Sequence, residues 1–212
     1  MTRLILVRHG ESRAIVEEIV GGHEGCKGLT DNGRRQAEAL RDRLARTHEL
    51  DDAAAVYASI LPRAVETAEI IAPAIGDGHQ VEQDCDLCEI HPGEGDGLGW
   101  TEFSEKYGTN DFNIEPWQSL APGGESVADF NHRIGSTLAR LARQHRGETI
   151  VLVCHGGVII GSMIEMLQLS RRGADRANVH PTFTSLTEWA RNDDANRWEL
   201  VRFNDHAHLA GA

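Results

Sequence analysis

The stretch Leu4-Ile5-Leu6-Val7-Arg8-His9-Gly10-Glu11-Ser12 decides the fold that we expect for this chain. Its first four residues are apolar without interruption, which is typical of a strand buried on both faces of a parallel sheet. The run ends in a cation, an imidazole and a glycine, and open α/β sheets bind ligands at the carboxyl ends of their strands. Taken alone, the pattern favours a strand that simply ends in a polar loop.

A second stretch changes this interpretation. Thr149-Ile150-Val151-Leu152-Val153-Cys154-His155-Gly156-Gly157 is again an apolar strand followed by histidine and glycine. Between the two, the short apolar run 55–58 precedes a helix that carries Arg63. Two strands that end alike in His-Gly are improbable by chance. We therefore predict a site at three strand ends, formed by Arg8, His9, Arg63 and His155.

With these motifs the sequence resembles the histidine phosphatase superfamily, in its phosphoglycerate mutase-like or acid phosphatase-like group. The matching segments are Arg8-His9-Gly10-Glu11, residues 59–68 and His155-Gly156-Gly157. Weaker matches lie at Leu29-Thr30 with Gly33 and Gln36-Ala37, at Pro122-Gly123-Gly124-Glu125-Ser126, and at Asn204-Asp205 with His208-Leu209. They occur in the family's order, so the resemblance covers essentially the whole chain.

Length and composition indicate an ordinary globular protein. The 212 residues fit a single domain, residues 1–212, and 40% are apolar while 25% are charged. The formal charge of −12 disfavours nucleic acid as a partner, although a local cluster of arginines can still bind an anion. No apolar run approaches the roughly 20 residues of a membrane span, and the N-terminus lacks a signal-peptide pattern. We expect a cytoplasmic protein that does not bind membranes.

Alternating strands and helices predict an α/β fold, a three-layer sandwich with a mostly parallel sheet and helices on both faces. We expect mostly loop over 12–30, a helix from Thr30 or Asp31 to about Thr47, and a helix capped by Ser59 that stops near Pro73. Further along the chain we expect a short strand near Val81, helices over 126–145 and 157–168, and a terminal hairpin over 183–203. Irregularly spaced aromatic residues over 99–124 predict an irregular lid-like excursion, within an insertion of about 90–124.

The residues at the strand ends suit phosphoryl transfer. The resemblance implies that His9 is the nucleophile and forms a phosphohistidine, and that His155 contacts the same phosphoryl oxygens. Arg8 and Arg63 offer planar forks that match phosphate. The resemblance also implies a carboxylate as general acid and base, in a Leu-x-Glu context that Leu87-Cys88-Glu89 matches. Nearby carboxylates that could compete with Glu89 are Asp84, Asp86, Glu94, Asp96 and Glu102.

Two further residues are candidates for substrate binding. Glu11 is expected to orient groups of its loop or to hydrogen-bond within the pocket. Ser59 contacts the phosphate side of the site or only caps the following helix, and the capping role is sufficient by itself.

The cysteines are Cys26, Cys85, Cys88 and Cys154. Cys85-x-x-Cys88 with His91, together with His23-x-x-Cys26, could form a metal site, but a single CxxC is a weak signal and the two pieces must meet in space. We expect free thiols in a reducing compartment, and we expect neither a metal nor a cofactor.

The segment after Arg-His-Gly-Glu-Ser argues against a mutase. The true mutases of the family usually continue with a Trp-Asn pair, whereas this chain continues Arg13-Ala14-Ile15-Val16. The region after Glu89 is rich in glycine and acidic residues, unlike a site that holds a second phosphate. We therefore favour hydrolysis of a small phosphomonoester. A primed mutase and a non-catalytic phospho-ligand-binding module remain as alternatives. The oligomeric state stays open, with a homodimer as one option.

Overall fold

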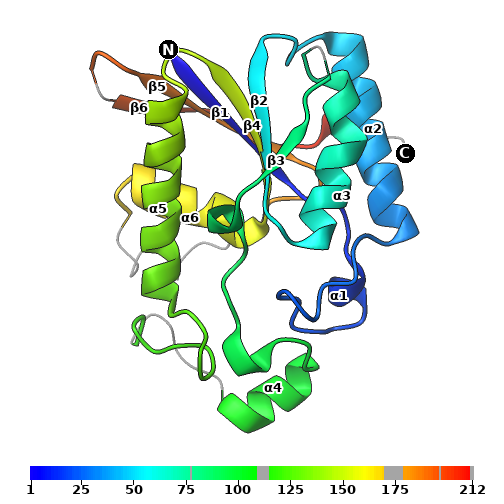
Figure 1. The fold of residues 1–212 in the computed structure, drawn as a ribbon, viewed down its shortest axis with the longest axis vertical. Coiled ribbons are helices and arrows are strands. Elements are labelled where there is room, and N and C mark those ends of the chain that lie inside the picture. Colours follow the sequence, from blue (N-terminus) through cyan, green and yellow to red (C-terminus); the bar gives the residue numbers. More distant parts are fainter. Residues whose placement is uncertain (77, 109–114, 170–178, 196, 211–212) are drawn as a thin grey trace.

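The computed structural model describes residues 1–212 except 77, 109–114, 170–178, 196 and 211–212. In the described part, six strands form one sheet in the order β3-β2-β4-β1-β5-β6, with helices on both faces (Figure 1). The strands are β1 (Thr2–Arg8), β2 (Ala53–Ala58), β3 (Val81–Gln83), β4 (Thr149–Cys154), β5 (Leu186–Asn192) and β6 (Arg197–Asp205). The predicted α/β architecture is thus confirmed.

The strands β3, β2, β4 and β1 pair in parallel, and β5 and β6 extend the sheet in antiparallel pairing. In the β1–β4 pair, Arg8 lies opposite Cys154. The residues that follow the two strands, His9 and His155, therefore emerge side by side at one edge. The predicted terminal hairpin is present as β5 and β6. The pairing of β5 along β1, which places the hairpin at the sheet edge, was not predicted.

The helices are α1 (Arg13–Val16), α2 (Asp31–Thr47), α3 (Pro62–Ile71), α4 (Trp100–Tyr107), α5 (Val127–Gln144) and α6 (Gly156–Met166). Short 3-10 turns are η1 (Ala72–Ala74), η2 (Cys85–Leu87), η3 (Gly93–Gly95) and η4 (Ala207–Leu209). Thr30 and Ser126 cap α2 and α5, since their side chains accept the backbone N–H groups of Gly33 and Asp129.

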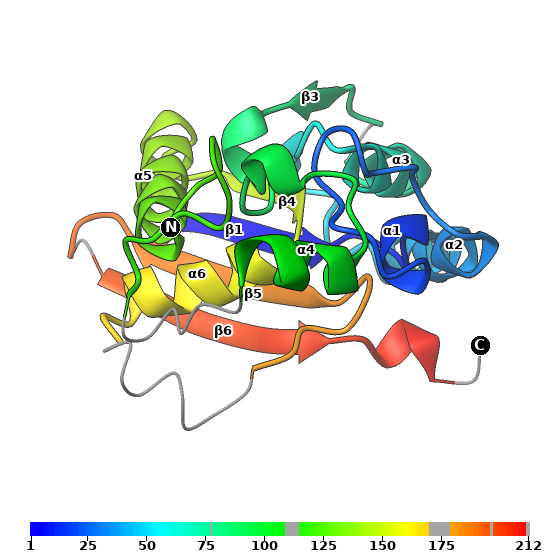
Figure 2. The ribbon, with the colours of Figure 1, turned by 90° about the horizontal axis from the view of Figure 1, so that it is seen from below.

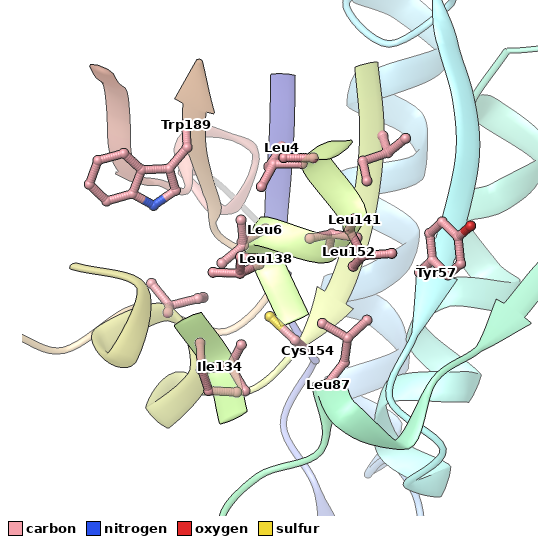
Figure 3. Packing of buried hydrophobic residues seen from close by; sticks show 14 of the residues in the cluster. Leu4, Leu6, Tyr57, Leu87, Ile134, Leu138, Leu141, Leu152, Cys154 and Trp189 are labelled. Carbon is pink, nitrogen blue, oxygen red and sulfur yellow. The ribbon is translucent and has the colours of Figure 1, made fainter. Parts of the chain in front are cut away.

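The uninterrupted apolar run of β1 is explained by two cores, one on each face of the sheet. Leu4 and Leu6 point to the face covered by α5 and α6, while Ile5 and Val7 point to the face covered by α2 and α3 (Figure 2). Figure 3 shows Leu138 of α5 beside Leu6 in the first core. Both faces of β1 are therefore fully buried from Leu4 to Val7, which holds its carboxyl end in place.

Three local predictions differ from the structure. Residues 13–16 of the predicted loop form the one-turn helix α1. Ser59 is not the N-cap of α3: Leu61 takes that position and Pro62 is the first helical residue, because Ser59 instead accepts the N–H of Leu61 at 3.2 Å. Within 99–124, residues 100–107 form the regular helix α4.

The aromatic spacing explains why α4 forms. Phe103 packs edge-on against Trp100 and Tyr107, with ring centroids 5.7 and 5.3 Å apart, because residues three and four apart share a helix face. Figure 1 shows α4 beyond the end of the sheet at which β1 ends. Residues 109–114 of the expected lid lie outside the described part of the chain. Among the described helices, none has the length and apolar character that crossing a membrane requires.

Candidate active site

Four predicted site residues meet at the carboxyl edge of the sheet. Arg8 ends β1 and His9 follows it, His155 follows β4, and Arg63 lies in the first turn of α3 after β2. The rings of His9 and His155 lie edge to face with centroids 5.1 Å apart. All four side chains are buried. Two cationic and two imidazole side chains therefore lie together at a site that is largely shielded from solvent.

The hydrogen bonds of His9 define its tautomer. Its Nδ1 lies 2.6 Å from the carbonyl oxygen of Gly10, which can only accept, so Nδ1 carries the proton. Nε2 is then an acceptor, and it receives the Nε–H of Arg63 at 3.1 Å. Burial and the charges of Arg63 and Arg8 hold the pKa of His9 well below its ordinary value, against the opposing bond to Gly10. His9 is a neutral ring with its Nε2 lone pair in the site.

Two buried nitrogen atoms in this cluster lack a hydrogen-bond partner. Arg8 donates through Nη1 to the carbonyl of Pro181, and its guanidinium carbon lies 4.2 Å from the ring centroid of Phe183. Its Nε is buried and unpartnered, as is Nδ1 of His155. A buried unpaired polar group costs about 1–3 kcal/mol, so this arrangement gains when an anion enters. Arg63 is anchored through Nη1 to the carbonyl of Gly21 at 2.7 Å.

Ser59 lies behind His155. Its hydroxyl accepts the N–H of Leu61, donates to Sγ of Cys88 at 3.3 Å, and lies 2.8 Å from Nε2 of His155. The single hydroxyl proton is committed to the sulfur, so Nε2 of His155 is the donor in the third contact. Burial, the charge of Arg63 and the neighbouring His9 hold the pKa of His155 well below its ordinary value. Ser59 thus orients His155 from the side away from Nδ1.

Glu89 lines the same pocket as His9 and comes from the loop after β3. Its Oε2 accepts the backbone N–H of Gly157, at the N-terminus of α6, at 3.0 Å. Its Oε1 accepts the backbone N–H of Ile90 at 3.2 Å. A Cβ at position 157 would lie 2.1 Å from Oε1 of Glu89, so a larger residue there would displace this carboxylate. The sequence analysis did not single out this role of Gly157.

Three of the five competing carboxylates are engaged elsewhere. Asp84 and Asp86 pair with Arg140, while Asp96 accepts the N–H groups of residues 22, 24 and 25. Of the six carboxylates considered, Glu89 is the one that lines the pocket. Glu11 is absent from the lining, because its carboxylate accepts from Thr30 at 2.6 Å and Asn32 at 3.3 Å beside the start of α2.

The pocket over this cluster has a volume of about 290 Å³. Arg8, His9, Arg63, Glu89 and His180 form its polar part. The apolar part includes Ile19, Val20, Trp100, Phe103, Leu120 and Ile160. The expected lid segment therefore does supply part of the wall, through α4. The strand ends gave no indication of Pro181 and Phe183, which reach Arg8 from a distant part of the chain.

Comparison with known proteins agrees with this geometry. The family model of the histidine phosphatase superfamily (branch 1) matches residues 4–206. The chain belongs to this superfamily. It is 33% identical over 213 residues to phosphoglycerate mutase-like protein 4 of Arabidopsis thaliana, covering 97% of this chain and 86% of the relative. It is also 33% identical over 214 residues to the metal-independent phosphoserine phosphatase of Arabidopsis thaliana, covering 99% and 84%.

Among solved structures, the superfamily fold matches a mutant phosphoserine phosphatase from Entamoeba histolytica in complex with phosphoserine. The TM-score is 0.77 at 25% identity, over 99% of this chain and 100% of the other. Relatives of this superfamily member thus include phosphatases and phosphoglycerate mutases, and one phosphatase structure holds phosphoserine.

Proposed function

We propose that this protein hydrolyses a small phosphomonoester through a phosphohistidine on His9, with Glu89 as general acid and base. The observation that carries the proposal is the state of His9. Its Nε2 is unprotonated, its pKa is lowered, and two arginines lie beside it. A neutral imidazole beside preorganised cations is what attack on a phosphoryl group requires.

The first step forms a bond between Nε2 of His9 and phosphorus and breaks the phosphorus–oxygen bond of the ester. Glu89 in its acid form gives its proton to the leaving oxygen. The N–H of Arg63 that holds Nε2 in the resting site turns to a phosphoryl oxygen, and the unpartnered Nε of Arg8 donates to another. His155 takes up a proton from solvent at Nδ1 when the dianion binds, donates it as a hydrogen bond to a phosphoryl oxygen, and returns it to solvent when phosphate leaves.

The second step restores the enzyme. The carboxylate of Glu89 removes a proton from water, the water oxygen attacks phosphorus, and the bond to His9 breaks. Inorganic phosphate leaves, Glu89 is again protonated and His9 is again neutral. No atom or electron is left unbalanced, and no step passes through a metal ion.

The pocket wall favours hydrolysis over transfer. Among the described lining residues, the two arginines both lie at His9, and the outer wall is largely apolar. A mutase has to retain a second phosphoryl group and keep water from the phosphohistidine. Both arginines of this wall lie beside His9 and suit one phosphoryl group there, and the metal-independent phosphoserine phosphatase at 33% identity supports the same activity.

The test is a product assay on p-nitrophenyl phosphate, phosphoserine and 3-phosphoglycerate, each with and without 2,3-bisphosphoglycerate. The proposal predicts release of inorganic phosphate from at least one substrate without the bisphosphate. Isomerisation of 3-phosphoglycerate that depends on the bisphosphate would favour a mutase. Binding without any turnover would favour a non-catalytic module. His9→Ala serves as the control for contaminating phosphatase.

A further inference from the structure

Two cysteines and two histidines converge at a place that forms no part of the pocket lining. Their ligand atoms, from His23, Cys85, Cys88 and His91, all lie within 4.8 Å of one another. Cys85 and Cys88 flank the turn η2, His91 follows on the same loop, and His23 comes from the loop after α1. Cys26, the partner suggested by the sequence spacing, is not in the group. We propose that these four side chains bind a structural zinc ion.

The two thiols are already placed as such a site requires. Their sulfur atoms lie 3.6 Å apart. Tetrahedral zinc with Zn–S bonds of about 2.3 Å needs a sulfur–sulfur separation of about 3.8 Å. The turn that spaces them is held without a metal, because the N–H of Cys88 donates to the carbonyl of Cys85 at 2.9 Å and Asp84 accepts the N–H of Asp86 at 2.9 Å.

His91 offers a nitrogen that the protein leaves unsatisfied. Its Nε2 is buried and has no hydrogen-bond partner, while Nδ1 faces Oε2 of Glu125 at 3.6 Å. Glu125 is fixed in turn by Arg133, with Nε and Nη2 each 2.7 Å from a carboxylate oxygen. A carboxylate behind the second nitrogen is the usual support of a metal-bound histidine.

The charges at the thiols also favour a cation. Two thiolates whose sulfur atoms lie 3.6 Å apart repel each other, so they are not stable side by side without a positive partner. Arg133 donates to the carbonyls of Asp86 and Cys88 rather than to either sulfur. A divalent ion supplies the missing charge and displaces the thiol protons.

The ligand set selects the metal. Two thiolates and two imidazoles in a closed four-coordinate group suit zinc, whereas magnesium and calcium take oxygen ligands. A closed group has no open position for water or substrate, so the ion is structural. The alternative chemistry, a Cys85–Cys88 disulfide, would leave the convergence of His23 and His91 unexplained.

Such an ion would join two walls of the pocket. His23 follows Gly22, which lines the pocket beside Gly21, the residue that anchors Arg63. Cys88 directly precedes Glu89 and accepts the hydroxyl of Ser59, which contacts His155. Zinc would therefore fix the loop of the general acid to the loop that holds Arg63, while remaining outside the reaction itself.

The test uses the full chain, purified with a non-thiol reductant, and measures metal content and cobalt binding. We expect one zinc per chain as isolated. After removal of zinc, Co²⁺ should give the visible bands of a tetrahedral site with thiolate charge-transfer absorption, and zinc should displace it. His23→Ala and Cys85→Ser should weaken zinc binding at least about 100-fold, the upper end of what loss of a supporting residue costs. Both positions are exposed, so the fold is expected to survive.

His132→Ala and Cys26→Ala are the matched controls and should bind zinc as the wild type does. Absence of binding would overturn the proposal, as would binding that His23→Ala and Cys85→Ser leave unchanged, which marks adventitious metal. A Cys85–Cys88 disulfide whose reduced form takes up no zinc would instead identify a redox pair. Phosphorylation of His9 is measured separately, in the zinc-free protein. The zinc proposal and the proposed function can then fail independently of each other.

Discussion

Nε of Arg63 lies 3.1 Å from Nε2 of His9, so the arginine side chain occupies the lone pair of the nitrogen that we propose as the nucleophile. The bond is possible only because Nδ1 of the same ring donates to the carbonyl of Gly10. In the resting site the arginine occupies the lone pair, and an incoming phosphate offers it a stronger acceptor. Substrate binding and exposure of the nucleophile are therefore one event.

Replacing Arg63 by lysine tests this relationship. Lysine keeps the positive charge but lacks the planar guanidinium group that hydrogen-bonds the Gly21 carbonyl and Nε2 of His9 at the same time. We expect kcat/KM for p-nitrophenyl phosphate to fall at least about 100-fold, as for loss of one preorganised donor. Arg35→Lys, on the exposed face of α2, should leave the rate unchanged. A rate for Arg63→Lys within about threefold of the wild type would show that charge alone suffices.

The protonation of His9 and His155 gives a second prediction. Burial and the neighbouring arginines lower both pKa values, so neither ring should titrate at about 6.5, where an unperturbed histidine does. NMR titration of the ring signals, assigned with His9→Ala and His155→Asn, should show both rings neutral at pH 6. On unfolding at low pH both rings take up protons, so they favour the folded state fully above about pH 6.5 and progressively less below it. A midpoint at or above 6.5 for His9 would contradict the account.

Gly157→Ala should displace Glu89. The added methyl would lie 2.1 Å from Oε1 of Glu89, whereas at Gly156 the nearest atom, Nε of Arg8, would be 3.5 Å away. We expect Gly157→Ala to impair alkyl phosphates much more than p-nitrophenyl phosphate, whose leaving group needs little protonation. Gly156→Ala is the matched control and should be clearly milder. Equal effects on both substrates would argue against Glu89 as the acid.

The C-terminal segment supplies a stability prediction. Asp205 makes two bonds to Arg43 of α2, at 2.6 and 2.9 Å, and these bonds hold the pKa of its carboxyl well below the ordinary value. The pKa of the Asp205 carboxyl is lower in the folded state than in the unfolded chain. The carboxylate therefore stabilises the fold above about pH 4, and this stabilisation is lost as the pH falls below that value.

Asp205→Asn should therefore lower the free energy of unfolding by about 1 kcal/mol at pH 7, since the pair is partly exposed. The difference from the wild type should shrink below about pH 4, as measured by urea denaturation. Asp42→Asn, in the exposed pair with Arg41, should have no measurable effect. A difference that persists unchanged at pH 3 would exclude the ion pair as its source.

The sequence predicted the parts of this protein that local patterns control. The apolar runs of β1 and β4 end in Arg8-His9 and Cys154-His155, and parallel pairing alone brings these ends together. The amphipathic spacing of Ala37, Leu40 and Leu44 likewise defines α2, where these residues are buried. Glu89 was predicted as the general acid from its Leu-x-Glu motif. Its position in the pocket agrees with that prediction, while its role stays untested.

Features that depend on distant contacts were not predictable in the same way. Ser59 seemed a helix cap by its position, yet its hydroxyl is committed to His155 and Cys88 across the loop. His23 lies 62 positions before Cys85, and no local pattern indicates that they meet. The edge position of β6 and the reach of Phe183 to Arg8 likewise follow from chain topology.

The most direct test of the central claim is chemical trapping of the phosphoenzyme. Zinc-free protein is mixed with a ³²P-labelled aryl phosphate, quenched within one turnover and assayed for a label that is stable to base and labile to acid. The account predicts label on His9 in the wild type, accumulation in Glu89→Gln because water is no longer activated, and none in a folded His9→Ala variant. Label on another residue, or wild-type turnover by His9→Ala, would contradict it.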